Sequence, residues 1–124
     1  MNPSQFCWNE LSTPDIHAAK EFYSKVFGWQ FKEIKTEEII YTIVSVNDQD
    51  IAGMWQIPNE MQGKIPPHWM AYLLVDDIHD SLKNARAHGA VEVKEVTEVK
   101  NMGRFAIITD PTGAHIAMWE VNKS

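Results

Sequence analysis

The sequence has little cysteine, no excess of positive charge and no long apolar run. Its 124 residues include one cysteine, Cys7, so an intramolecular disulfide is excluded. No run approaches the roughly 18 apolar residues that a membrane-spanning helix needs. Lysine and arginine total 11 against 17 aspartate and glutamate, and the net charge is -6. Because nucleic-acid binding normally requires a basic face, we expect neither nucleic acid nor a membrane as a partner.

Several catalytic and targeting signatures are also missing. The chain has no glycine-rich phosphate loop, no Gly-x-Ser-x-Gly elbow and no Cys-x-x-Cys pair, so we expect no cofactor held by such motifs. The N-terminal segment MNPSQFCWNE lacks a basic stretch followed by an apolar one, so no signal peptide is expected. Together with the single cysteine, this favours a cytoplasmic location.

What the sequence does contain is an internal repeat with an offset of about half the chain. Asp15-Ile16-His17 recurs as Asp77-Ile78-His79, and each triplet opens an amphipathic helical pattern. Each helical pattern stops at a glycine, Gly28 or Gly89, which suits the left-handed residue just past a helix end. The repeat therefore predicts two equivalent helices, one in each half of the chain.

Strand-like runs repeat in the same order, with one before each helix and three after it. The expected strands are Phe6–Leu11, Trp29–Ile34, Ile39–Val46, Ile51–Ile57, Trp69–Val75, Val91–Val96, Arg104–Thr109 and Ala114–Val121. Residues 58–67 contain three prolines and a glycine and are expected to link the two halves, residues 4–57 and 68–121. The pattern predicts one α+β domain, residues 1–124, made of two tandem βαβββ units. An α+β sandwich without duplication is the alternative.

Three segments resemble the vicinal-oxygen-chelate proteins, which include glyoxalases, bleomycin-resistance proteins and extradiol dioxygenases. Leu11–Trp29 resembles their opening helix, with an Asp, then Phe-Tyr, then Phe-Gly. Residues 68–77 resemble the opening strand of their second half, and Gly103–Ala114 resembles their closing strand, turn and strand. The resemblance covers nearly the whole chain and is closest to the small single-domain members. It implies curved mixed sheets that form a cleft.

The resemblance also implies a divalent metal in that cleft, held by the first and last strands of each unit. Counting from the helix-opening and turn aspartates puts the ligand positions at Trp8, Gly53, Met70 and Ala117. Members of the group use histidine, glutamine or glutamate there, because such metals need imidazole, carboxylate or amide donors. We therefore expect no metal, and no metal-dependent glyoxalase I or dioxygenase activity of the standard kind.

Strand alternation assigns further residues to the cleft, since side chains two apart share a face. If Trp8, Met70 and Ala117 face the cleft, the residues two positions before and after each of them on the same strand also face it. The ligand-binding candidates on these strands are Trp8, Trp55, Met70, Tyr72 and Trp119. Arg104 is a further candidate, because it opens a strand aimed at the cleft mouth and its guanidinium suits a clamp on a ligand carboxylate or phosphate. The catalytic candidates are Glu10, His68 and His115.

Two functions stay open. The first is a binding protein without metal that holds a small aromatic or amphipathic molecule against the tryptophans, as antibiotic-binding members of the group do. The second is a glyoxalase-type lyase or isomerase in which Glu10 works with His68 or His115 as acid and base. A purely structural role is the alternative for each residue, such as a surface salt bridge for Arg104. The resemblance also implies a homodimer, the commonest closed assembly.

Overall fold

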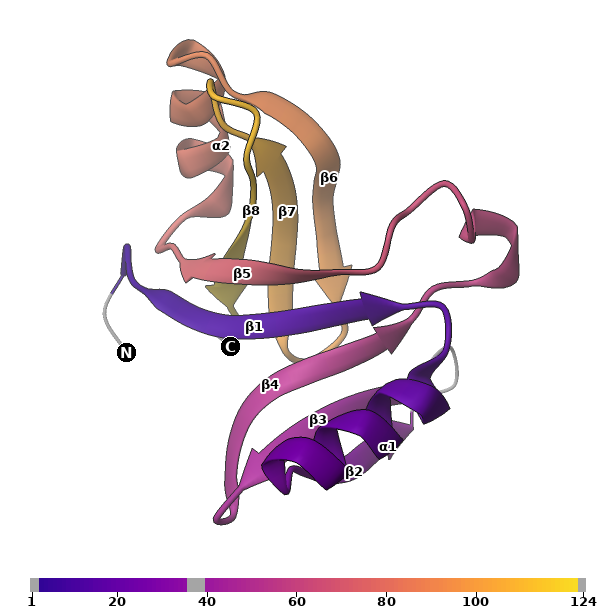
Figure 1. Cartoon of the computed structure of the whole chain (residues 1–124). Helices are drawn as coiled ribbons and strands as arrows, with labels where there is room; N and C mark the ends of the chain where they lie inside the picture. Colours follow the sequence, from indigo (N-terminus) through magenta and orange to yellow (C-terminus); the bar gives the residue numbers. More distant parts are fainter. Residues whose placement is uncertain (1–2, 36–39, 123–124) are drawn as a thin grey trace. The chain divides into compact units, whose positions relative to one another are not determined.

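The computed structural model describes residues 3–35 and 40–122, which form eight strands, two α-helices and one turn of 3-10 helix (Figure 1). In chain order these are β1 (Phe6–Thr13), α1 (Ile16–Phe27), β2 (Gln30–Lys35), β3 (Ile40–Val46), β4 (Gln49–Gln56), η1 (Asn59–Met61), β5 (His68–Leu74), α2 (Ile78–Ala87), β6 (Val91–Val99), β7 (Gly103–Thr109) and β8 (His115–Val121). Ile39, where the third expected strand begins, lies outside the described residues. Neither described helix is long and apolar enough to cross a membrane.

The chain divides into two compact units. One unit is Trp8–Trp69, and the other joins the residues up to Cys7 with those from Met70 onwards. The first residues belong with the second unit because the Ser4 amide donates to the Leu74 carbonyl at 2.7 Å and the Leu74 amide donates to the Gln5 carbonyl at 2.9 Å. The division into halves at residues 4–57 and 68–121 stays a prediction.

Both units have the same strand order. In Trp8–Trp69 the order is β2-β3-β4-β1; β3 is antiparallel to both β2 and β4, and β1 is parallel to β4. In the other unit the order is β6-β7-β8-β5, with β5 parallel to β8 and the rest antiparallel. The prediction of an α+β fold made of two tandem βαβββ units is therefore confirmed.

Each helix covers one face of its own sheet (Figure 1). The buried core under α1 consists of Leu11, Val44, Ala52 and Met54, with Ile16, Ala19, Tyr23, Trp29 and Phe31 packed against it. The buried core under α2 consists of Ile78, Leu82, Ala106, Ile108 and Met118. Because strand side chains alternate, the residues between these core positions lie on the opposite face of each sheet. That second face carries most of the candidate site residues.

Both helices begin with the same two contacts. The Asp15 carboxylate accepts from the Ala18 amide at 3.0 Å, and the Asp77 carboxylate likewise caps α2. A side chain from the last strand of each unit also accepts from the first helical amide. Gln56 Oε1 accepts from Ile16 N, and Glu120 Oε1 accepts from Ile78 N, both at 2.9 Å. The repeat read from the sequence is thus also a repeat of contacts.

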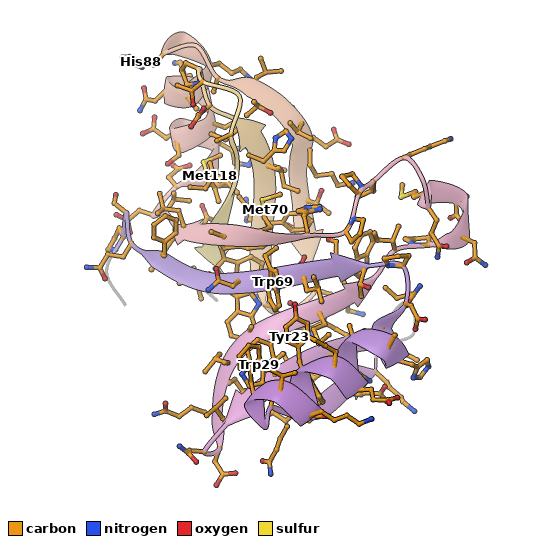
Figure 2. All side chains as sticks on the ribbon, in the orientation of Figure 1. Tyr23, Trp29, Trp69, Met70, His88 and Met118 are labelled. Carbon is orange, nitrogen blue, oxygen red and sulfur yellow. The ribbon has the colours of Figure 1, made fainter. Side chains whose placement is uncertain are left out.

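Aromatic and apolar side chains gather on and beside α1. Tyr23 stacks on Trp29 with ring centroids 4.9 Å apart, and Trp69 contacts both rings edge-on (Figure 2). The indole N–H of Trp69 donates to the Tyr23 hydroxyl at 3.1 Å.

No residue of α1 is fully buried, and Phe22, Val26 and Phe27 are more than half exposed. We call these last three residues the α1 apolar surface.

Candidate functional site

Strand pairing in the first unit places Trp8, Glu10 and Gly53 on the face opposite α1. Glu10 pairs with Gly53, while its neighbour Leu11 pairs with Met54 in the core under α1. Trp8 lies two residues before Glu10 on β1 and so shares its face. The sequence analysis placed Trp8 and Glu10 on the same face of this strand, and the structure places them there.

A tyrosine from β3 completes this group. The Trp8 indole N–H donates to the Tyr41 hydroxyl at 3.0 Å, and that hydroxyl donates to Glu10 Oε2 at 2.7 Å. A Cβ built on Gly53 would lie 1.6 Å from the Tyr41 hydroxyl oxygen, so the tyrosine occupies the space above the glycine. We call Trp8, Glu10, Tyr41 and Gly53 the tyrosine site.

Tyr41 was missed by the sequence reasoning. A signal was present, because a glycine inside a strand often marks a place where another group approaches the backbone closely. The glycine alone does not say which side chain approaches. That choice depends on the register between β3 and β4, where Ile43 pairs with Gly53 and the register shifts between Val44 and Ser45. The shift is a bulge-like irregularity that sequence patterns do not reveal.

The second unit has an aromatic face of its own, opposite α2. Tyr72 pairs with Ala117 and Phe105 pairs with Trp119, whereas Met118 packs into the core under α2. The Tyr72 and Phe105 rings lie 6.3 Å apart at an angle of 57°. Three predicted ligand-binding residues, Met70, Tyr72 and Trp119, share this face by alternation, and both Met70 and Tyr72 are buried.

A glycine lies beneath an aromatic ring in this unit too. A Cβ on Gly103 would come within 2.8 Å of the Trp119 ring and closer still to the Glu120 carbonyl. Trp55 in the first unit pairs with Ser12 and therefore shares the face of Glu10, where it is half-buried. Each unit thus presents tryptophan and tyrosine side chains on the sheet face away from its helix.

Arg104 lies on the other side of its sheet. It pairs with Glu120, whose carboxylate accepts a hydrogen bond from the first amide of α2. The Arg104 guanidinium is 3.4 Å from Glu120 Oε2 and 3.5 Å from His79 Nε2. This is the salt bridge that was the alternative to a ligand clamp, and it places Arg104 on the face covered by α2.

The two candidate histidines are both held at the start of a strand. His68 Nδ1 lies 2.7 Å from the Pro66 carbonyl at the start of β5, so the ring carries its proton on Nδ1. His115 is exposed at the start of β8, where its Nδ1 lies 2.8 Å from Thr109 Oγ1.

The turn before His115 is fixed by Asp110. Its carboxylate accepts from the Thr112 hydroxyl at 2.7 Å, the Thr112 amide at 2.8 Å and the Ala114 amide at 3.1 Å. These hydrogen bonds, the Thr112 hydroxyl first, lower the pKa of Asp110 because they favour the charged carboxylate.

Metal-ligating side chains do not gather in the described parts of the chain. Among residues 3–35 and 40–122, no group of three or more His, Cys, Asp or Glu side chains is placed to hold a metal ion. At the positions assigned to metal ligands, glycine and alanine have no donor atom, and the Trp8 indole N–H is already donating to Tyr41. Methionine is a soft ligand that does not suit Zn, Ni or Mn in an oxygen and nitrogen site.

Comparisons with known proteins agree on the family to which this chain belongs. The family model described as Glyoxalase/Bleomycin resistance protein/Dioxygenase superfamily matches residues 6–118. The protein named "Putative glyoxylase CFP32" of Mycobacterium tuberculosis is 30% identical over 94% of this chain and 45% of its own length. The anthracycline biosynthesis protein DnrV of Streptomyces peucetius is 28% identical over 94% of this chain and 47% of its own length. The chain therefore spans about half the length of these curated relatives.

The solved structures agree on the fold. Methylmalonyl-CoA epimerase from Mycobacterium tuberculosis matches 94% of this chain and 87% of its own chain with a TM-score of 0.65. Its sequence identity to this chain is 17%, so the likeness concerns the fold alone.

Proposed function

Since the chain belongs to the glyoxalase/bleomycin resistance protein/dioxygenase superfamily, we propose that it binds a small aromatic or amphipathic molecule at the tyrosine site, without a metal. The observation that carries this proposal is the position of the Tyr41 hydroxyl, directly over Gly53 and hydrogen-bonded to Trp8 and Glu10. An aromatic side chain occupies the place where the resemblance puts a metal ligand. The site is therefore built from flat rings and one carboxylate.

The donor set argues against a metal at this place. Position 53 has no side chain, and no larger residue fits there while Tyr41 keeps its position. Trp8 adds no oxygen or imidazole donor either, so positions 8 and 53 do not suit a divalent metal. In the other unit, Met70 and Ala117 likewise provide no such donor. Protein purified without a histidine tag is expected to contain no stoichiometric transition metal by elemental analysis.

The chemistry of the tyrosine site favours a planar ligand that is neutral or positively charged. Rings of tryptophan and tyrosine stack well on flat molecules, and a carboxylate attracts a cationic group. The net charge of -6 acts in the same direction, because it repels anions over the whole surface. One relative is named as an anthracycline biosynthesis protein. Anthracyclines have fused flat rings and an amino sugar, so we choose one as the first probe.

The test is calorimetric titration of the protein with doxorubicin. We expect saturable binding that Trp8→Ala weakens by about 1–3 kcal/mol, the contribution of a large aromatic contact. Trp69→Ala is the matched control. Trp69 contacts Tyr23 of α1, and α1 covers the sheet face opposite the tyrosine site, so this variant should leave the affinity unchanged. Equal weakening by both variants, or no heat of binding from doxorubicin, would refute the proposal.

A second candidate function is proton transfer at Glu10. It is favoured by the 2.7 Å hydrogen bond between the Tyr41 hydroxyl and Glu10, which joins a phenol to a carboxylate in one site. The sequence predicts that Glu10 works with His68 or His115, and that pairing stays a prediction. Deuterium exchange beside a carbonyl group of a small ketone, abolished by Glu10→Gln, would favour this function over simple binding.

For the assembly we propose a homodimer in which a second copy of the chain covers the α1 apolar surface. Phe22, Val26 and Phe27 are 55%, 54% and 61% exposed, which is high for three neighbouring apolar side chains on one helix. The curated relatives are about twice as long as the part that this chain matches, and a second copy would supply a segment of that size.

A further inference from the structure

The starts of the two helices differ in one respect that the repeat makes visible. In the second unit, Arg104 fills the space beside Glu120 and His79 at the start of α2. At an offset of 64 residues, the equivalents of Arg104 and Glu120 are Ile40 and Gln56. A charged pair in one unit is therefore replaced by a neutral pair in the other.

Ile40 and Gln56, the neutral pair, line a cavity in the first unit. Its volume is about 510 Å³, and it lies between the start of α1 and strands β2, β3 and β4. Its lining includes Ile16, Lys20, Glu33, Ile40, Thr42 and Gln56. Cavities that bind small molecules usually measure roughly 300–1,000 Å³, so the size is sufficient.

Thr42 lines this cavity and has a hydroxyl without a hydrogen-bond partner among the described residues. The residue is 1% exposed, and its hydroxyl is the one buried side-chain oxygen or nitrogen without a hydrogen-bond partner among residues 3–35 and 40–122. Buried polar groups in folded proteins are nearly always paired, so an unpaired one requires an explanation. The repeat equivalent, Ala106, is fully buried as an alanine, so packing at this position does not need a hydroxyl.

The charges around the cavity restrict what it can hold. Lys20 is already paired with Glu33 at 3.2 Å, and the nearby Asp15 carboxylate caps α1. Asp15 and Glu33 both line the cavity and Lys20 is already paired, so an anionic ligand meets two carboxylates and gains little to offset the loss of its hydration. The remaining wall is largely apolar, and a threonine hydroxyl can both donate and accept a hydrogen bond.

We propose that this cavity binds a small neutral molecule with an apolar body and one hydroxyl or carbonyl oxygen, which pairs with Thr42 Oγ1. Thr42 and Tyr41 are adjacent on β3 and point to opposite faces of the sheet. The cavity is therefore separate from the tyrosine site, and either site can exist without the other.

The experiment is a titration of the ¹⁵N-labelled protein with benzyl alcohol and, separately, with toluene, which has no oxygen. We expect benzyl alcohol to shift the amide signals of Ile16, His17 and Thr42 saturably, and toluene to bind about tenfold more weakly, as expected for the loss of one buried hydrogen bond. Thr42→Val, which removes only the hydroxyl, should weaken benzyl alcohol by the same factor and leave toluene unchanged.

Two further variants complete the test. Ile40→Arg combined with Gln56→Glu rebuilds the arrangement of Arg104 and Glu120 in the first unit, and should abolish the binding of both probes in a folded protein. Thr97→Val makes the same chemical change in β6 and should alter neither affinity. Equal affinities of benzyl alcohol for wild type and Thr42→Val, shifts confined to other residues, or no saturable shift would each overturn the proposal.

Discussion

The fit between Tyr41 and Gly53 can be tested by adding a single methyl group. In Gly53→Ala the new Cβ would lie 1.6 Å from the Tyr41 hydroxyl oxygen. Ordinary contact requires roughly 3.5 Å, so the hydroxyl must move by about 2 Å. That movement breaks the hydrogen bonds to Trp8 and Glu10, which are 3.0 Å and 2.7 Å long.

The expected loss follows from those two bonds. A neutral hydrogen bond contributes about 1 kcal/mol and one to a carboxylate about 1.5–3 kcal/mol. Trp8 and Glu10 are partly exposed and can bind water instead, so we expect Gly53→Ala to lower the free energy of unfolding by about 2 kcal/mol. The measurement is urea denaturation followed by circular dichroism.

A double-mutant cycle separates this cause from any effect of alanine itself. Gly53 has no positive φ, so its backbone does not require a glycine. In a Tyr41→Ala background the space above position 53 is open. There Gly53→Ala should be neutral, or stabilise by about 0.5–1 kcal/mol, because alanine loses less backbone freedom on folding. If Gly53→Ala costs the same with and without Tyr41, the reasoning about the tyrosine site is wrong.

Two other predictions concern the turn before β8 and the assembly. The lowered pKa of Asp110 contributes stability that is present above the pKa of the unfolded chain and is lost as the pH falls through the lower pKa of the folded protein. Wild type should therefore lose more stability than Asp110→Asn between pH 5 and pH 2 (roughly the range over which such a carboxylate titrates), as urea midpoints would show; parallel pH profiles would contradict this. Sedimentation equilibrium should give a dimer for wild type and a monomer for Val26→Glu, whereas a wild-type monomer at concentrations on the order of tens of micromolar would exclude the dimer.

The fold was predictable because its signals are local and occur twice. The triplets at Asp15 and Asp77, with Gly28 and Gly89 after the helices, mark both helices. In the structure Gly28 is the left-handed residue that ends α1 with φ 73°, and Gly89, with φ 99°, directly follows the cap residue His88 of α2. Such signals depend only on neighbouring residues, so they can be read without knowing the tertiary structure.

The site was predictable only where it depends on alternation along one strand. Alternation placed Trp8 with Glu10, and the structure agrees. It could not find Tyr41, because the approach of that ring to Gly53 is set by pairing between strands. Arg104 was expected to clamp a ligand because it opens a strand. In the structure it forms a salt bridge with Glu120, on the sheet face that α2 covers. The ligand, the dimer and the cytoplasmic location stay predictions.

The side chains that accept the first helical amides also determine when each helix can be completed. Ile16 and Gln56 are 40 residues apart, and Ile78 and Glu120 are 42 residues apart. During synthesis each helix is therefore made well before the strand that satisfies its first amide. Contacts over such long separations slow folding, because a large loop must close before the contact forms. A nascent chain that stops short of β8 has α2 without this contact, so the last few residues of the unit decide whether its helix is anchored.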